Sequence, residues 1–435
     1  MNVPKPLAVL LLCDYDPFGA RMIQDSIHAL ARKSRHEVRC LSFRGDLPEN
    51  MDLSRFDAIA IHYSSFIYSD RYVSPDARRR IAAFAGTKVV FLHDEYKHVN
   101  LTKSVLAELG VSGLFTCFDA REAERVYGDL CAHGMRSFSV LPGYVPQELL
   151  ALGRGPACGS RPIDIGYRGR MYPPWHGTLG QDRVRIHKRV KADAPGFGLV
   201  VDSSVAERDR LYGKKWLAFQ RRCKTVLGTE SGASVVDFTG QVARDVEAHL
   251  AQAPETPFEE LRSLYFADLD ESIRLRTLSP RIFEAIACGC GLILYEGAYA
   301  GRLKVGRHYL PLAHDHANFG ELVKALREPG RIDALVETAR VEVLLAPENQ
   351  EEHFVGHVDD VLIRLQGQGK AIGYEQREFI RRFGRYDFGL TKPLLKRQLF
   401  RIARSAYMMG TRALPMSVER KLTRAVRGAL FDVLP

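Results

Sequence analysis

Short apolar runs alternate with amphipathic segments along the first 150 residues, and each run has the length of one element of secondary structure. The apolar runs predict buried strands at Leu7–Leu12, His36–Phe43, Ala58–His62, Lys88–Leu92, Leu114–Phe118 and Ser137–Leu141. Apolar residues at helical spacing predict helices at Phe18–Arg32, Pro75–Ala85, Lys103–Leu109 and Ala120–Tyr127. This alternation favours an α/β domain with a parallel, doubly wound sheet.

The same alternation returns after a Gly- and Pro-rich stretch that ends at Arg161, which is typical of a linker between domains. Strands are predicted at Ile163–Tyr167, Phe197–Asp202, Lys224–Leu227 and Leu292–Leu294. Helices are predicted at Asp182–Lys191, Asp209–Arg222, Pro257–Asp268, Asn318–Arg327 and Arg331–Leu345. The pattern therefore indicates two domains, 1–150 and 161–350. A further helix at Glu351–Leu365, within 351–375, is able to cross back towards the first domain.

The stretch LSPRIFEAIACGCGLIL (278–294) combines a helix start with two charged residues on one helix face. Ser279 is a favourable cap, and Pro280 suits the first helical position. Arg281 and Glu284 stand three residues apart, so they share a face near the N-terminus. Backbone N–H groups at a helix N-terminus favour an anion, and a carboxylate can hold a diol. The alternative is an ordinary αβ unit with an Arg–Glu pair on its surface.

Polar residues follow several predicted strands, where open α/β sheets bind ligands. Gly19 lies at a strand-to-helix turn, either to admit a ligand or simply to make the turn. His93 begins the polar group HDEY after a strand, which lines a crevice or forms an ordinary polar loop. Arg168 and Arg170 flank a glycine, an arrangement that suits a phosphate, although solvated surface arginines are the alternative. The loop with Glu230 and Ser231 makes a pocket lining plausible; it lacks the ending of a Walker loop.

The composition is ordinary for a globular protein, with 46% hydrophobic and 26% charged residues. None of the eight cysteines forms a C-x-x-C pair, so reduced cytosolic thiols are expected instead of zinc or disulfides. No apolar run is long enough for a transmembrane helix, and no signal segment is evident. The sequence thus predicts a cytoplasmic protein.

The net charge of +10 belongs to the C-terminal tail. Residues 376–435 carry 14 Lys and Arg against 4 Asp and Glu, whereas the remaining residues hold 48 of each sign. Apolar and basic positions in this tail predict two basic amphipathic helices separated near Pro415. These helices favour binding of 376–435 to an anionic membrane surface, at the inner face of the membrane. The alternative is that their apolar faces pack on the body of the protein or on a partner subunit. No nucleic-acid-binding module accompanies the charge.

Five segments together resemble glycosyltransferases of the GT-B fold: IDIGYRGR (163–170), VLGTESGASV (226–235), SPRIFEAIACG (279–289), EGAY (296–299) and RHYLPL (307–312). The sequence is most similar to the group-1, spore-maturation-like (CgeB-like) branch of retaining enzymes. The resemblance implies two Rossmann-like domains that face each other across a cleft. It also implies a hexosyltransferase that moves a sugar from a nucleotide-diphosphate sugar to a glycan or lipid-linked acceptor, without a metal or other cofactor.

The resemblance also implies roles for individual residues. Glu284 matches the glutamate that holds the donor ribose, and Arg168 or Arg170 matches the cation that neutralises the diphosphate. Where many retaining members have a glutamate eight positions before Glu284, this sequence has Arg276, so Glu230 is the substitute expected near the sugar. The expected site is completed by an acceptor-domain histidine and by further substrate-binding residues: His93, Gly19, Ser231, Arg281, Tyr299 and His308. A sugar-nucleotide epimerase of the same fold stays open as an alternative, and so does a non-catalytic nucleotide-sugar-binding protein, which Arg276 in place of the glutamate slightly favours.

Overall fold

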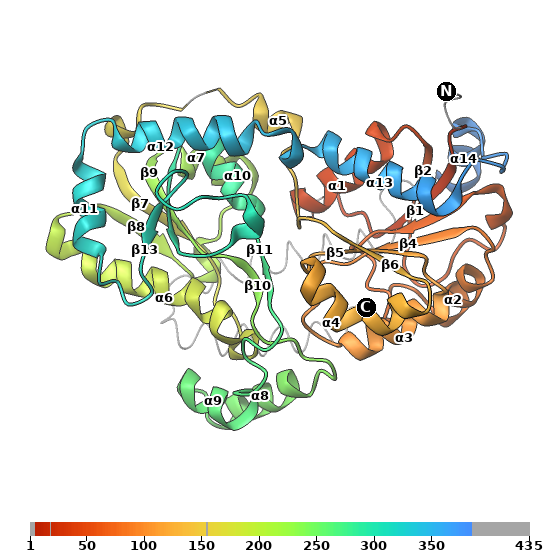
Figure 1. Cartoon of the computed structure of the whole chain (residues 1–435), viewed down its shortest axis with the longest axis horizontal. Helices are drawn as coiled ribbons and strands as arrows, with labels where there is room; N and C mark the ends of the chain where they lie inside the picture. Colours follow the sequence, from red (N-terminus) through yellow and green to blue (C-terminus); the bar gives the residue numbers. More distant parts are fainter. Residues whose placement is uncertain (1–4, 18, 154, 385–435) are drawn as a thin grey trace.

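The protein, seen in a computed structural model that describes residues 5–17, 19–153 and 155–384, consists of two α/β domains side by side (Figure 1). Each domain is built on one parallel sheet with helices on both faces. Parallel strands need a crossover connection, usually a helix, and this accounts for the alternation along the sequence.

The first domain has a six-stranded parallel sheet in the order β2-β1-β3-β4-β5-β6. Its strands are β1 (Ala8–Cys13), β2 (Glu37–Ser42), β3 (Ala58–Ile61), β4 (Thr87–Phe91), β5 (Gly113–Thr116) and β6 (Arg136–Ser139). Its helices are α1 (Arg21–Lys33), α2 (Pro75–Ala82), α3 (Val99–Leu109) and α4 (Ala120–Ala132). Helices α2, α3 and α4 cover one face, while α1 and a later helix, α13 (Glu351–Gln366), cover the other.

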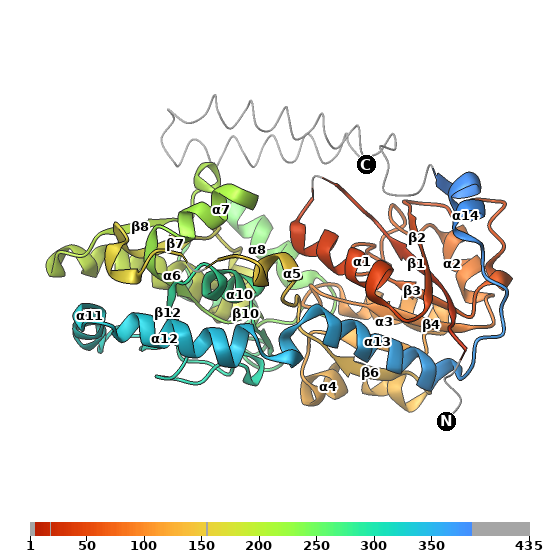
Figure 2. The same ribbon diagram turned by 90° about the horizontal axis from the view of Figure 1, so that it is seen from above.

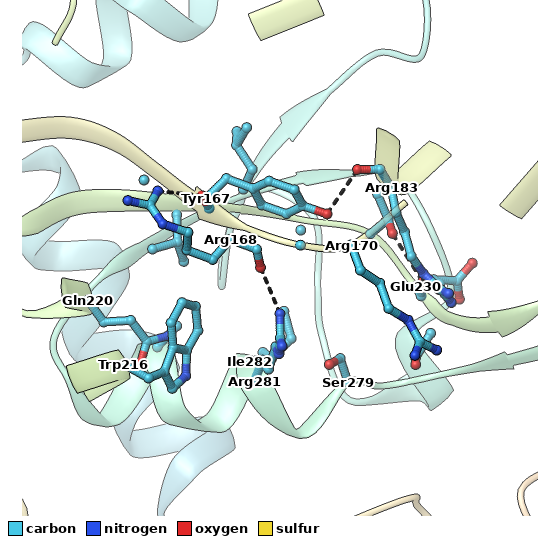
Figure 3. Close-up of a pocket in the computed structure, with 18 of the residues that line it drawn as sticks. Tyr167, Arg168, Arg170, Arg183, Trp216, Gln220, Glu230, Ser279, Arg281 and Ile282 are labelled. Atoms are coloured by element: carbon cyan, nitrogen blue, oxygen red, sulfur yellow. Dashed lines mark hydrogen bonds between the residues drawn. The ribbon is translucent and has the colours of Figure 1, made fainter. Parts of the chain in front are cut away.

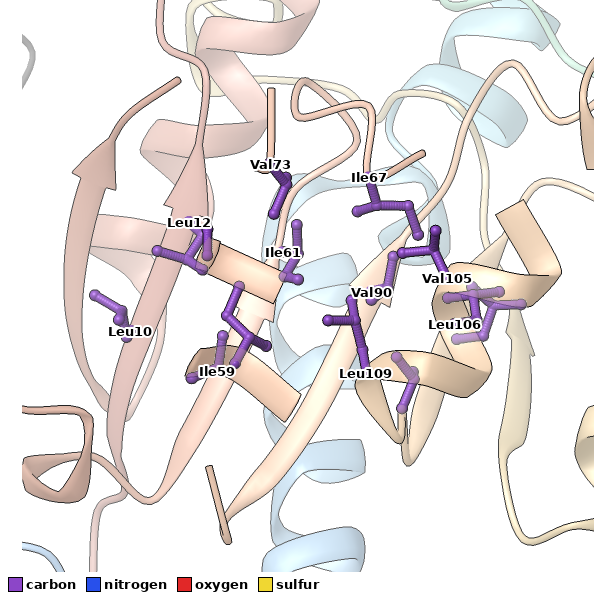
Figure 4. Packing of buried hydrophobic residues seen from close by; sticks show 14 of the residues in the cluster. Leu10, Leu12, Ile59, Ile61, Ile67, Val73, Val90, Val105, Leu106 and Leu109 are labelled. Carbon is purple, nitrogen blue, oxygen red and sulfur yellow. The ribbon is translucent and has the colours of Figure 1, made fainter. Parts of the chain in front are cut away.

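The core of this domain explains why its strands are continuous apolar runs. Leu10, Ile59 and Val90 lie on three neighbouring strands and are fully buried (Figure 4). Leu106 and Leu109 of α3 belong to the same buried cluster. Because helices cover both faces of the sheet, residues of either parity are buried, and β1 has no exposed position.

The second domain has a five-stranded parallel sheet in the order β13-β12-β9-β7-β8. Its strands are β7 (Ile163–Arg168), β8 (Val201–Ser204), β9 (Cys223–Gly228), β12 (Gly291–Tyr295) and β13 (Leu310–Leu312). Its helices are α5 (Gln147–Leu150), α6 (Gly177–Asp193), α7 (Gly213–Gln220), α10 (Pro280–Ala287), α11 (Phe319–Arg327) and α12 (Arg331–Ala339). Helices α6, α11 and α12 pack on one face, and α5, α7 and α10 pack on the other.

The segment between β9 and α10 leaves the second sheet and joins the two domains through hydrogen bonds to the first domain. It contains the antiparallel pair β10 (Ser231–Ala233) and β11 (Leu275–Thr277), with α8 (Gln241–Gln252) and α9 (Phe258–Tyr265) between them. The N–H of Asp237 donates to the carbonyl of Tyr96 at 2.8 Å, and the N–H of Asn100 donates to the carbonyl of Phe238 at 2.9 Å. Figure 1 shows α8 and α9 projecting at the junction of the domains. Helix α9 was predicted from the sequence, whereas α8 and the β10–β11 pair were not.

The chain returns to the first domain through α13, which lies beside α1 in Figure 2. A last described helix, α14 (Gln376–Phe383), packs on the same domain because Phe379 and Phe383 belong to its buried core. The rest of the predicted basic tail, including both predicted helices around Pro415, lies outside the described residues. No helix in the described part of the chain has the length and hydropathy required to cross a membrane.

The predicted fold class, two Rossmann-like α/β domains, is confirmed, but several element boundaries were wrong. The strand predicted at Phe197–Asp202 begins only at Val201, because Ala194–Phe197 form a 3-10 turn that ends at Gly198 in the left-handed region. The helix predicted at Asp182–Lys191 begins earlier, at Gly177, and the one predicted at Asp209–Arg222 is shorter, at Gly213–Gln220.

Candidate functional site

A cavity of about 220 Å³ opens at the carboxyl ends of β7 and β9, beside the N-terminal end of α10. Of the predicted site residues, five line it: Arg168, Arg170, Glu230, Ser231 and Arg281. Figure 3 shows Arg170, Arg183 and Glu230 at one end and Trp216 and Gln220 at the other. We call this the first cavity. The motifs that the sequence analysis placed at strand ends thus meet at one edge of the second sheet.

The two arginines around Gly169 differ in how their guanidinium groups are used. Arg168 donates to a carboxylate oxygen of Asp202 at 2.7 Å and to the Asp202 carbonyl at 3.0 Å, and it lies 4.2 Å from the centre of the Phe219 ring. These contacts hold the end of β7 against β8. Arg170 is exposed at the cavity, so it is the better placed of the two to meet an anion.

Arg170 shares the ring of Tyr172 with a second cation, Arg183. The guanidinium carbons of Arg170 and Arg183 lie 4.7 and 4.2 Å from the centre of that ring. Burial acts to raise the pKa of the Tyr172 hydroxyl, but the charges of Arg183 and Arg170 bring this pKa below its ordinary value. Arg183 was not among the predicted site residues, because one arginine in the basic helix α6 resembles an ordinary surface residue.

Glu230 is buried and both of its carboxylate oxygens have partners. One accepts from Nη1 of Arg276 at 2.9 Å, and the other accepts from the backbone N–H of Tyr299 at 2.9 Å. The β10–β11 pairing brings Arg276 to this place, with Gly232 opposite it in the register. Arg276 is therefore a charged partner of Glu230. Glu230 acts here as a positioning group, because it holds Arg276 and the backbone of Tyr299. Its predicted approach to a sugar stays a prediction that this geometry does not favour.

Arg281 and Glu284 on α10 both contact Trp216. The guanidinium carbon of Arg281 lies 5.2 Å from the Trp216 ring centre, and Nη1 of Arg281 donates to the carbonyl of Arg168 at 2.7 Å. Trp216 Nε1 donates to Glu284 at 2.7 Å, and burial raises the pKa of Glu284 above its ordinary value. Within the described residues no ion pair joins Arg281 to Glu284, so the alternative of a simple surface Arg–Glu pair does not apply.

A second cavity of about 330 Å³ lies between the domains, with walls from both. Glu284 and Trp216 line it from the second domain, and His93 lines it from the first. Trp216 also lines the first cavity, so the two cavities adjoin at this residue. The Nδ1 of His93 lies 3.3 Å from a carboxylate oxygen of Asp94, and Asp94 in turn interacts electrostatically with Arg170. We call this the second cavity.

Three predicted substrate-binding residues lie outside both cavities. Gly19 forms a turn in which its N–H donates to the carbonyl of Asp16. The Tyr299 hydroxyl donates to the carbonyl of Tyr295 in the core, and Tyr299 reaches the site only through its N–H to Glu230. Buried His308 accepts from the N–H of Lys304 and pairs with Glu342 at 2.9 Å. Direct substrate contacts by these residues find no support here, because the backbone N–H of Gly19 serves a turn and the side-chain polar atoms of Tyr299 and His308 have partners within the protein.

No group of three or more His, Cys, Asp and Glu residues in the described ranges could hold a metal ion. All eight cysteines, which lie within those ranges, are free.

Two facing Rossmann-like domains with a cavity at the carboxyl edge of the second sheet form a GT-B architecture, as the sequence resemblance implied. No protein-family model matches the chain, and no curated protein matches it either.

Several solved structures have a similar fold at low sequence identity. An α-glucosyltransferase in complex with UDP-glucose and DNA is 10% identical, over 82% of this chain and 99% of that one, with a TM-score of 0.47. HepE of Anabaena in complex with UDP is 11% identical, over 82% of this chain and 100% of that one, with a TM-score of 0.44. The GtfA/B complex is 10% identical, with a TM-score of 0.39 over 71% of this chain, which spans only 57% of that one.

Proposed function

We propose that this protein is a glycosyltransferase that uses a nucleoside-diphosphate sugar as its donor. The observation that carries the proposal is the first cavity, where Arg170, Arg183 and Arg281 gather at the carboxyl ends of parallel strands and at a helix N-terminus. Fixed cations and free N–H groups of this kind suit the diphosphate of a leaving group. The motif likeness to the spore-maturation-like (CgeB-like) branch of GT-B enzymes supports the same class.

In the proposed reaction, an acceptor oxygen forms a bond to the anomeric carbon of the donor sugar while the bond from that carbon to the diphosphate breaks. The acceptor proton is released to solvent, and the nucleoside diphosphate leaves with an additional negative charge. Arg170 and Arg281 would stabilise that charge, typically by a few kcal/mol, without a metal. The contact of Glu284 with the ribose hydroxyls stays a prediction that this geometry does not favour, because Glu284 lines the second cavity and not the first.

The finer parts of the proposal follow the sequence resemblance. The transfer is of a hexose with retention of configuration, in polysaccharide biosynthesis, and the acceptor is a glycan or a lipid-linked sugar. The protein would work in the cytoplasm at the inner face of the membrane, with its basic tail on anionic lipid.

The first prediction concerns nucleotide binding, measured by calorimetry with UDP, GDP, CDP and dTDP. One of them is expected to bind, and Arg170→Ala is expected to raise its dissociation constant about tenfold, because about 1.4 kcal/mol of charge-assisted bonding is lost. Arg35→Ala, which removes an exposed arginine that lines neither cavity, serves as the matched control and is expected to leave the dissociation constant unchanged. Failure of all four nucleotides to bind would overturn the proposed function.

The second prediction concerns the membrane. The full chain is expected to float with vesicles of anionic lipid, and a chain that ends at residue 384 is expected to lose most of this binding, at about 1 kcal/mol for each suitably placed cation. The truncation keeps α14, because Phe379 and Phe383 are part of the first domain's core. Equal flotation of both chains would contradict the membrane proposal. Neutral vesicles are the control.

A non-catalytic nucleotide-sugar-binding protein is the second candidate. The observation that favours it is the pairing of Glu230 with Arg276 and with the N–H of Tyr299, which gives each oxygen of Glu230 a partner within the protein. Donor binding without transfer to a broad panel of acceptors, and without hydrolysis of the donor, would decide for this candidate.

A further inference from the structure

The second cavity has mostly apolar walls, contributed by both domains. Met22 of α1 and Phe91 at the end of β4 come from the first domain, with Phe354 of α13 beside them. Leu217 of α7 and Leu149 of the short helix α5 come from the second domain. A cavity of about 330 Å³ with such walls is large enough for a small apolar ligand and offers few partners to the many hydroxyls of a free sugar.

The charged groups that line the second cavity are predominantly acidic. Asp25, Glu148, Glu284 and Glu351 line it, against the two cations Arg21 and Lys214. Glu351 is neutralised by Lys33 at 2.7 Å, and exposed Arg21 lies 3.4 Å from Asp25. Burial raises the pKa of Asp25, the charge of Arg21 opposes this shift, and the charge of Glu148 adds to it. The carboxylates therefore already repel one another, and a ligand with a negative charge would be repelled as well.

The second cavity is also next to the first. Trp216 forms part of both walls, and His93 in the second cavity is followed by Asp94, which interacts with Arg170 in the first. The two cavities therefore adjoin at Trp216, at the end of the first cavity that lies opposite Arg170 and Arg183.

We propose that the second cavity binds an uncharged alcohol with an apolar body, and that this alcohol is the acceptor. The apolar walls select the body of the ligand, and the carboxylates exclude an anion such as a fatty acid or a lipid phosphate. The identification as acceptor rests on the proposed function; the binding of an apolar, uncharged ligand does not.

The test is calorimetry of the full chain with three probes, each below its micelle concentration. Octyl β-D-glucoside has an apolar chain and no charge, octanoate has a similar chain with a negative charge, and methyl β-D-glucoside has the sugar without the chain. Octyl β-D-glucoside is expected to bind at least about tenfold more tightly than either of the others. Equal affinity for octyl and methyl glucosides, or for octyl glucoside and octanoate, would overturn the proposal.

Two variants locate the binding and separate its causes. Met22→Glu, in the cavity wall, is expected to weaken octyl glucoside binding about tenfold, whereas Leu264→Glu on exposed α9 is the matched control and is expected to leave it unchanged. Asp25→Asn is expected to strengthen octanoate binding several-fold without changing that of octyl glucoside, because it removes only the charge. If Asp25→Asn changed neither probe, the proposed charge selection would be wrong.

The proposed function and this inference fail separately. Nucleotide binding reports on the first cavity, and octyl glucoside binding reports on the second. If octyl glucoside bound but no nucleotide did, the second cavity would be retained as a ligand site and the proposed glycosyltransferase function would be rejected.

Discussion

Arg276→Ala is expected to lower the free energy of unfolding by about 3–5 kcal/mol, among the largest effects of any single substitution in this chain. Arg276 is the charged partner of Glu230, whose side chain is only 3% exposed. Without the guanidinium, that carboxylate keeps only the N–H of Tyr299 and becomes an uncompensated buried charge. Chemical denaturation followed by circular dichroism measures the loss.

A neighbouring arginine provides the matched control. Arg274 is 56% exposed and pairs at 3.0 Å with Glu271, which also pairs with Arg276 at 2.7 Å. Because Glu271 keeps Arg276 as a partner, Arg274→Ala is expected to lower stability by less than about 1 kcal/mol. The double variant Arg276→Ala/Glu230→Gln is expected to recover most of the loss, because it removes the buried charge as well. If Arg276→Ala lowered stability no more than Arg274→Ala does, Glu230 would not depend on Arg276.

Much of the fold could be predicted because each sheet is parallel and covered on both faces. Such strands must be continuous apolar runs, and β1 and β12 are buried at every position. Strand ends then follow from the runs themselves, so Arg168 and Arg170 were correctly placed at an edge of the second sheet.

What the sequence analysis missed depends on contacts between distant parts of the chain. Glu230 meets Arg276 only because β10 pairs with β11 across an excursion of two helices. Trp216 was recognised as a helical residue, but its place between two cavities depends on how α7 packs against α10. The second cavity has walls from α1, α7 and α10, and no local pattern specifies how two domains face each other.

The group HDEY (93–96) after β4 contains one residue that lines a cavity, as predicted, and one that belongs to the core of the first domain. His93 lines the second cavity, as the crevice interpretation expected. Glu95, two residues later, points into the first domain, where it accepts from the hydroxyls of Thr116 and Tyr127 and from the N–H of Cys117, each at 2.7 Å. Side chains that alternate in direction cannot all enter one crevice, so a polar cluster at a strand end supplies both site and core residues.

This buried carboxyl group is expected to make the first domain more stable as the pH falls from about 8 to about 5. Burial raises the pKa of Glu95 to about 7, from an ordinary value of 4.5. The folded state therefore binds a proton more tightly than the unfolded state does, and this contribution is lost as the pH rises through about 7. The difference between the two pKa values corresponds to about 3 kcal/mol. Native-state hydrogen exchange of amides in β4 and β5 measures the free energy of unfolding of this domain.

Glu95→Gln isolates this contribution from all others. The amide keeps an acceptor for the N–H of Cys117 but does not titrate, so the stability of the variant relative to the original chain is expected to rise by about 3 kcal/mol as the pH increases over the same range. Buried His62, whose pKa is lowered to about 3 by burial, acts in the opposite direction, but its effect cancels in this comparison. Glu124→Gln, on the exposed side of α4, is the control and is expected to show no such difference. A difference that did not change with pH would mean that Glu95 is already ionised in the folded protein, held by its three donors against the effect of burial.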